Sequence, residues 1–274
     1  MAPITRLAVL AMLASAAFVN AVPVLAPVEP SGAVPALAAS DAFASAPETS
    51  SPVLEKRAVA TVITKCTKPG TIAITFDDGP SDFTNGLLDI LKKKGVKTTF
   101  FLNGVNYGNI TDRADVVKRA YKEGHQIASH TWSHQDLATL TTSQIKTEMK
   151  KLDDAVKKII GVRPVFMRPP YGSVNDQVLS VLGSQGYKVV TWDKDTEDWK
   201  HPTDVAKSLK VYTKIFGTAG EVKKAGHIVL EHDTHELTAL SLAPQAIDLA
   251  ISKGFKVVPV GTCLGVSSSA WYRK

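Results

Sequence analysis

Asp77 and Asp78 are adjacent acids at the end of an apolar segment, within the sequence TFDDGP at residues 75–80. The apolar run over residues 71–76 predicts a buried strand, and the Gly-Pro pair after the acids predicts a turn. Where the backbone begins to turn, both carboxylates can face one pocket, and a metal ion between them relieves their repulsion. On this segment alone, an aspartate-rich turn that only ends the strand is an equally good interpretation.

His130 and His134 follow a second short apolar run, at residues 126–128. On one helical turn or a tight loop both imidazoles project the same way, which suits two nitrogen ligands of one transition metal. The chain has seven histidines, so a structural or surface pair remains open when these two are taken alone. With one aspartate oxygen, the set has the composition of a hydrolytic metal site with positions left for water and substrate.

Five short motifs follow one another along the chain. They are TFDDGP at 75–80, HTWSH at 130–134, RPPYG at 168–172, DTEDW at 195–199 and LEH at 230–232. In this order they resemble the polysaccharide deacetylase family, the carbohydrate esterases with a NodB-type domain, and most of all its secreted fungal chitin deacetylases. The resemblance extends to nearly everything after residue 57. It implies a hydrolase that removes N-acetyl groups from the N-acetylglucosamine residues of chitin or another N-acetylated polysaccharide.

The resemblance also assigns the metal side of such a site. Asp78, His130 and His134 are expected to hold the ion, and Asp77 is expected to take a proton from its water. Arg168 is expected to pair with Asp77, orienting it and keeping it ionised, and beside both the metal cation and Arg168 the carboxylate of Asp77 is expected to titrate low. A surface ion pair is the alternative for Arg168. Two imidazoles and one carboxylate favour Zn²⁺, with Co²⁺ or Ni²⁺ able to replace it.

The opposite side of the site must protonate the leaving amine. His232 is the expected acid, and Asp198 is expected to hold its ring and raise its pKa. Tyr171 offers a backbone N–H to the oxyanion, and Trp199 and Leu230 are expected to surround the acetyl methyl group. A core histidine and ordinary barrel packing are the alternatives. The histidines outside the motifs are expected to be structural or surface residues: His125, His201, His227 and His235.

Strands and helices alternate in the part of the chain that carries the motifs. Apolar runs predict strands near residues 71–76, 98–102, 125–128, 165–168, 187–192, 227–231 and 256–260. Helical patterns lie between them at 82–94, 112–123, 142–160, 175–185, 203–216 and 237–253. Because motifs at several strand ends must converge on one pocket, a closed arrangement is favoured. We predict an α/β fold, a distorted (β/α) barrel of about seven parallel strands with its site at their C-terminal ends, as the resemblance also implies.

The helix expected over residues 142–160 contains another acidic pair, Asp153 and Asp154. Lys157 and Lys158 lie four residues further on. This spacing predicts a solvated helix face with two ion pairs, unlike the pair at Asp77 and Asp78.

The chain divides into three segments. Residues 1–21 have one basic residue, an apolar stretch too short to span a bilayer, and small residues at the end, which predicts a secretory signal peptide. Residues 22–57 are rich in Ala, Pro, Ser and Val and predict a pro-segment or linker that ends in Lys56-Arg57. That pair is either a processing site, leaving Ala58 as the first residue, or two solvated charges. Residues 58–274 form the expected catalytic domain of a secreted or cell-wall protein.

Secretion bears on the two cysteines and on one asparagine. Cys66 and Cys263 are expected to form a disulfide, with two unpaired buried thiols as the alternative. Asn109 begins a glycosylation sequon. The formal net charge of +6 is spread over the chain, without a basic cluster interleaved with aromatic residues. We therefore expect no nucleic-acid partner and no membrane anchor, and we expect a monomer.

Other functions remain open from the sequence. The same site would serve acetylated xylan or peptidoglycan. A glycosidase would also use two carboxylates in a barrel, but it needs neither the histidine pair nor a metal. A non-catalytic sugar-binding module is the weaker alternative, because every motif position is present.

Overall fold

The structure is a computed structural model, and it describes residues 58–216 and 225–274. The predicted signal peptide and the segment that ends at Arg57 lie outside the described residues. Within the described ranges, no helix combines the length and the apolar character needed to cross a bilayer.

A nine-stranded sheet lies at the centre of the fold, and its strand pairs are parallel. Its strands are β1 (Val62–Ile63), β2 (Thr71–Asp77), β3 (Thr99–Leu102), β4 (Gln126–Ser129), β6 (Phe166–Met167), β7 (Lys188–Val190), β8 (Lys194–Asp195), β9 (His227–His232) and β10 (Lys256–Val257). Eight are joined in the order β1-β7-β6-β4-β3-β2-β9-β8, and β10 also pairs with β2. All the strands expected from apolar runs are present; β1 and β8 are additional.

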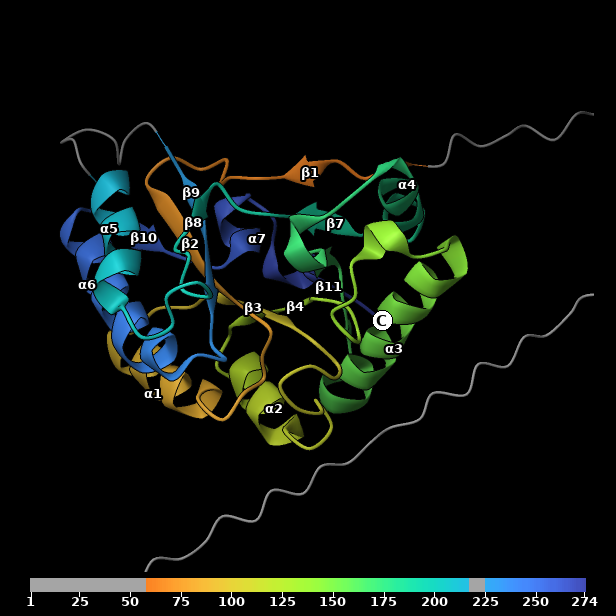
Figure 1. The fold of residues 1–274 in the computed structure, drawn as a ribbon, viewed down its shortest axis with the longest axis horizontal. Helices are drawn as coiled ribbons and strands as arrows, with labels where there is room; N and C mark the ends of the chain where they lie inside the picture. The colour runs from red at the N-terminus through yellow and green to blue at the C-terminus, as the bar shows by residue number, and fades with distance from the viewer. Residues whose placement is uncertain (1–57, 217–224) are drawn as a thin grey trace, which may run out of the picture. The chain divides into compact units, whose positions relative to one another are not determined.

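The sheet curls into a distorted barrel (Figure 1). In a flat sheet of this strand order, six intervals would separate β7 from β8 by about 29 Å. Residues 191–193 alone connect these strands in the chain, and such a connection spans at most about 14 Å. The two edges of the sheet must therefore curve toward each other. The predicted distorted (β/α) barrel is confirmed.

Helices cover the outside of the sheet, with α1, α5 and α6 beside β2, β8 and β9 in Figure 1. The main helices are α1 (Thr84–Lys94), α2 (Ala114–Lys122), α3 (Thr142–Ile160), α4 (Asp176–Ser184), α5 (Val205–Ile215) and α6 (Ala243–Ser252). Each falls within a predicted helical segment. The last segment differs in its first part, because a π-helical turn, Thr238–Leu242, precedes α6.

Helix α3 illustrates how local sequence sets these elements. The hydroxyl of Thr141 accepts a hydrogen bond from the Gln144 N–H, and the Gln144 side chain accepts one from the Thr141 N–H, which forms a capping box. Gly161 ends the helix with a φ of 83°, in the left-handed region that glycine adopts at little cost. The apolar stripe of helix α3 is buried and consists of Ile145, Met149, Leu152 and Val156.

The barrel interior is apolar below the strand ends. Small and large side chains from successive strands fill it: Ala73, Phe101, Ala128, Phe166, Val190 and Ile228. Cys66 and Cys263, the latter at the end of the short helix α7 (Val260–Cys263), form a disulfide that packs against this interior. Cys66 contacts the carbonyl of His227, at the beginning of β9. The disulfide therefore lies at the end of the barrel opposite the C-terminal ends of the strands.

The acidic pair in α3 differs from our expectation. Asp154 pairs with Lys150 and Arg163 rather than with a lysine four residues further on. Asp153 is only 5% exposed and pairs with Arg273 at 2.8 Å. Arg273 belongs to β11 (Tyr272–Arg273), which pairs in antiparallel fashion with β5 (Arg163–Pro164). The predicted solvated face was wrong because a strand from the end of the chain packs there.

Candidate active site

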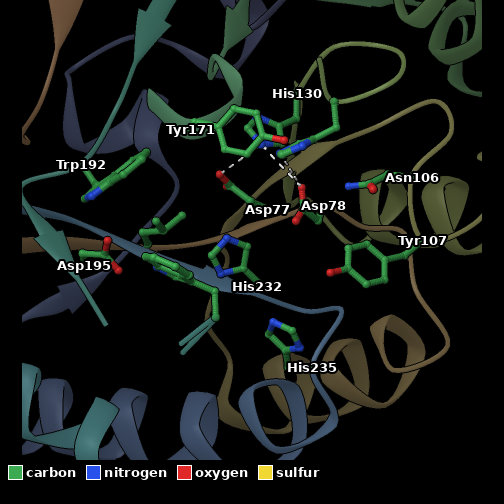
Figure 2. Close-up of a pocket in the computed structure, with 13 residues that line it drawn as sticks. Asp77, Asp78, Asn106, Tyr107, His130, Tyr171, Trp192, Asp195, His232 and His235 are labelled. Atoms are coloured by element: carbon green, nitrogen blue, oxygen red, sulfur yellow. Dashed lines mark ion pairs between the residues drawn. The ribbon is translucent and has the colours of Figure 1, made fainter. Parts of the chain in front are cut away.

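Polar side chains from several strand ends meet in one cavity of about 600 Å³ (Figure 2). Asp77 ends β2, Asp195 ends β8 and His232 ends β9, while His130 directly follows β4. All lie at the C-terminal edge of the parallel sheet. Parallel strands bring such ends together even where more than one hundred residues separate them in the chain, as between Asp77 and His232.

The turn after β2 brings two adjacent acids to the same cavity. Asp77 is 2% exposed, and Asp78 has a φ of 73°, in the left-handed region. In a continuous strand the two side chains would point to opposite faces. Left-handed backbone costs a non-glycine residue about 1–2 kcal/mol, and such strain persists where the surroundings fix it. The conformation of Asp78 is therefore the local reason that both carboxylates line the cavity.

Asp78, His130 and His134 form a cluster suited to a metal ion. Their ligand atoms all lie within 4.8 Å of one another. Asp78 Oδ1 is 3.3 Å from His134 Nε2 and 3.6 Å from His130 Nε2, and it is buried without a hydrogen-bond partner among the described residues. His130 Nδ1 donates to the Arg168 carbonyl at 2.7 Å, which leaves Nε2 free to act as a ligand. These donors fit a divalent transition metal.

The charge states of these groups agree with that fit. Burial, followed by the charge of His134, holds the pKa of His130 well below its ordinary value. Burial also lowers the pKa of His134 and raises the pKa of Asp78. Neutral imidazoles are the form that binds metal ions.

Arg168 fixes the position of Asp77. Its guanidinium is fully buried and donates to Asp77 Oδ1 at 2.6 Å, to the Thr75 hydroxyl at 2.7 Å and to the Thr191 carbonyl at 3.0 Å. It also stacks over the Phe101 ring, 4.1 Å from the ring centroid. A guanidinium held by this many contacts fixes the direction of the carboxylate that it binds.

The expectation that Asp77 titrates low applies to a site with a bound cation beside it, and for that site it stays a prediction. Burial raises the pKa of Asp77 to about 6, although Arg168 and His232 lower it; the neighbouring Asp78 adds to the rise. The Arg168 ion pair is present as expected. Its effect is smaller than the cost of holding a carboxylate charge in a buried site.

His232 and Asp198 form the second ion pair of the cavity. His232 Nδ1 lies 2.8 Å from Asp198 Oδ1, and the backbone N–H of His232 donates to Asp198 Oδ2 at 2.8 Å. Burial alone would lower the pKa of His232, but its hydrogen bond to Asp198 and the surrounding carboxylates outweigh burial and raise the pKa to about 9. This agrees with the expected rise. With Nδ1 bound to Asp198, the ring presents Nε2 to the cavity.

The three remaining residues expected in the site also line the cavity: Tyr171, Trp199 and Leu230. Tyr171 is 70% exposed, has a φ of 61° and packs edge-on against His134, with ring centroids 4.8 Å apart. Trp199 is 49% exposed, whereas Leu230 is buried. The exposed indole and the buried aliphatic side chain both contribute apolar surface to a cavity that also has polar groups.

Comparison with known proteins decides the family of this chain. The sequence profile of the family "Polysaccharide deacetylase" matches residues 64–190. A chitin deacetylase from Pestalotiopsis sp is 45% identical over 228 residues, which make up 82% of this chain and 75% of that protein. The chain belongs to the polysaccharide deacetylase family.

Other polysaccharide deacetylases show the same likeness in fold and in sequence. The solved structure of the chitin deacetylase from the fungal pathogen Colletotrichum lindemuthianum matches with a TM-score of 0.75 at 39% identity, covering 78% of this chain and 96% of that one. A probable peptidoglycan-N-acetylglucosamine deacetylase from Arthroderma benhamiae is 46% identical over 77% of this chain, which spans 48% of that relative's length. The similar proteins are thus named for two different polymers, chitin and peptidoglycan.

The cavity of this polysaccharide deacetylase has further lining residues to which the sequence led us to assign no role. They are Asn106, Tyr107, Trp192, Asp195 and His235. For His235 we expected a structural or surface position, and the structure places it half-buried in the cavity wall. Each of the five ends a strand or follows one within five residues. A position at or shortly after the C-terminal end of a strand is therefore the feature of the sequence that these five residues share.

Proposed function

We propose that this protein is a metal-dependent hydrolase that removes N-acetyl groups from N-acetylglucosamine residues of chitin or chitooligosaccharides, giving chitosan and acetate. One observation carries the proposal: Asp77 with Arg168 and His232 with Asp198 flank the same metal-binding cluster in a single cavity. Hydrolysis of an amide needs a base for the attacking water and an acid for the leaving amine. The names of the chitin deacetylases similar to this chain support the choice of substrate.

Asp78, His130 and His134 would hold the ion, with Zn²⁺ as its identity and Co²⁺ or Ni²⁺ as substitutes. When bound, such an ion supplies Lewis-acid activation of water and of the acetyl carbonyl oxygen. The buried oxygen of Asp78 without a partner supports this assignment.

Asp77 acts as the general base. It accepts a proton from the water whose oxygen attacks the acetyl carbon, while Arg168 holds the carboxylate in place. The backbone N–H of Tyr171 donates to the oxyanion that forms on the acetyl oxygen. The acetyl methyl group lies against Trp199 and Leu230.

His232 acts as the general acid. Its raised pKa keeps the ring protonated at neutral pH. As the carbon–nitrogen bond breaks, Nε2 donates a proton to the sugar nitrogen, which leaves as an amine, and acetate is the second product. Asp198 orients the ring and stabilises its charge.

Peptidoglycan is the second candidate substrate, favoured by the relative from Arthroderma benhamiae. Acetylated xylan is a third. Acetate release from chitin oligomers, peptidoglycan fragments and acetylated xylan, with and without a chelator, separates these candidates. A glycosidase would shorten the oligomers, and a binding module would retain them without releasing acetate.

The protein's location and maturation belong to the same proposal. We expect a secreted, monomeric enzyme of the extracellular space or cell wall that begins at Ala58, carries a glycan on Asn109 and binds neither nucleic acid nor membranes. The exposed position of Asn109 supports the modification. N-terminal sequencing and intact mass of the secreted protein, before and after enzymatic deglycosylation, test these points. An N-terminus at Val22 or an unchanged mass would contradict them.

A further inference from the structure

Asp195 is a half-buried carboxylate in the wall of the cavity, and it takes no part in the proposed deacetylation steps. Figure 2 shows it beside Trp192, on the opposite side of the cavity from Asn106 and Tyr107. Its Oδ1 accepts a hydrogen bond from the Glu197 N–H at 2.8 Å. No hydrogen bond to the other carboxylate oxygen is found in the described part of the chain, so that oxygen can accept one from a ligand.

The cations around Asp195 are engaged elsewhere. Lys194 lies 3.7 Å from Asp193, and Lys200 lies 2.7 Å from Glu197. Burial lowers the pKa of Arg168, and the charges of Asp77 and Asp195 oppose that shift; the guanidinium is buried and bound to Asp77. Among residues 58–216 and 225–274, no side chain forms an ion pair with Asp195. A carboxylate without an ion-pair partner among these residues favours a ligand with a cationic group.

The aromatic neighbours of Asp195 favour the same kind of ligand. Trp192 and Trp199 line the cavity with it. The ring of Trp199 already accepts one ammonium, because Lys200 Nζ lies 4.8 Å from its centroid. Indole faces attract cations and also pack against sugar rings. A carboxylate that lines the same cavity as two indoles is therefore suited to an amino sugar in its protonated form.

We propose that Asp195, together with Trp192 and Trp199, binds the ammonium group of a glucosamine residue adjacent to the N-acetylglucosamine residue being deacetylated. The inference rests on the proposed function, because that reaction produces glucosamine within the chain. The ammonium donates to the open oxygen of Asp195 and pairs with its charge. The enzyme then acts more efficiently on chains that it has already begun to deacetylate.

The test compares two substrates of equal length: a fully acetylated chitin oligomer, and oligomers with a single glucosamine at each defined position. The measured quantity is the ratio of kcat/KM for the second substrate to kcat/KM for the first. For one position of glucosamine, Asp195→Asn should lower this ratio about fivefold through KM, since a half-exposed ion pair with a cation–π contribution has about that effect. Asp115→Asn is the matched control, because Asp115 is an exposed aspartate outside the cavity that pairs with Lys118, and its ratio should equal that of the wild type.

A measurement on the wild-type protein needs no variant. Raising the salt concentration from about 0.01 M to about 0.15 M shortens the screening length from about 30 Å to about 8 Å and should lower the ratio. If Asp195 instead accepts a sugar hydroxyl, Asp195→Asn will slow both substrates in proportion, and the ratio will not change. A ratio insensitive to both the substitution and salt overturns the assignment of Asp195. Absence of acetate release from every oligomer would instead contradict the proposed function.

Discussion

Each of the two ion pairs of the cavity joins a carboxylate to a cationic group. Burial has the larger influence on the pKa of the reactive group in one pair, and the ion pair itself has the larger influence in the other. On one side the carboxylate of Asp77 is the proposed reactive group and Arg168 positions it. On the other, the imidazole of His232 is the proposed reactive group and Asp198 positions it. Burial dominates the first pair and raises the pKa of Asp77 to about 6, whereas pairing dominates the second and raises the pKa of His232 to about 9.

Neighbouring carboxylates act in the same direction on both groups, because Asp78 adds to the rise in the pKa of Asp77, and Asp198, Asp77 and Asp78 raise the pKa of His232. Asp77, Asp78, Asp195 and Asp198 contribute four carboxylates, against the guanidinium of Arg168 and the imidazolium of His232. Excess negative charge stabilises the protonated form of any nearby group. A divalent ion at the Asp78 cluster would offset that excess and favour the ionised form of Asp77. The comparison therefore teaches that the base side depends on a cation, while the acid side already has its partner.

The largest expected effect follows from removing that cation. Chelation, or His130→Ala, should reduce acetate release by at least about a thousandfold, because several kcal/mol of transition-state stabilisation are lost. Zn²⁺ should restore the chelated wild type but not the variant. Metal content by mass spectrometry and activity on chitin oligomers are measured together. His201→Gln, a change outside the cavity, is the control, and full activity in metal-free protein would refute the assignment.

The next largest effect should come from the base. Asp77→Asn should lower kcat by at least about a hundredfold, the usual scale for a general base, while the protein keeps its metal. Asp82→Asn changes a nearby exposed aspartate and should leave kcat and metal content as in the wild type. Loss of metal in Asp77→Asn would show that Asp77 is a ligand, and the distinction between the two adjacent acids would then fail.

The acid side should respond differently to the leaving group. His232→Ala should cost about a hundredfold or more on an acetylated amino sugar and much less on an aryl acetate, whose leaving group needs no proton. The two rates are measured on the same protein preparation. Asp77→Asn should slow both substrates, which makes it the matched comparison. Equal losses on the two substrates in His232→Ala would assign His232 a role other than protonating the amine.

The smallest effect is a displacement of the pH profile. His232, with its pKa raised to about 9, is a competent acid below that pH and loses its proton above it. Asp198→Asn removes the charge that raises this pKa, so the alkaline limb of kcat/KM should move to lower pH by about one to three units. The acid limb should move less, since burial and Arg168 set the pKa of Asp77. An unmoved alkaline limb would mean that another group controls it.

The two acidic pairs show what the sequence could predict. Asp77 and Asp78 follow an apolar run and precede a Gly-Pro turn, so the location of their carboxylates at a strand end was encoded nearby. Asp153 and Asp154 lie within a clear helix, and the helix was predicted correctly. The partner of Asp153 is Arg273, more than one hundred residues away, which no local spacing could reveal.

The same difference, between features encoded by nearby residues and features that depend on distant ones, applies to the strands and to the residues of the site. Apolar runs predicted the other strands of the large sheet, even β6 and β10, which contain two residues each. Strand β8 has no apolar residue, and the two apolar residues of β1 lie between threonines, so neither forms an apolar run. Motif residues were found because the five motifs, in their order along the chain, resemble those of a known family. Tyr107 and His235 come from loops of ordinary composition, and only the closure of the barrel brings them to the cavity.

The connection over residues 191–193 limits how such an enzyme can be altered. It joins β7, the strand next to one edge of the sheet, to β8 at the other edge, and it also places Trp192 in the cavity wall. Extra residues there would let the edges separate, whereas the loops after β3 and β9 can lengthen without opening the barrel. Natural divergence and laboratory libraries should therefore accept insertions around Tyr107 and His235, but only single-residue replacements at Trp192.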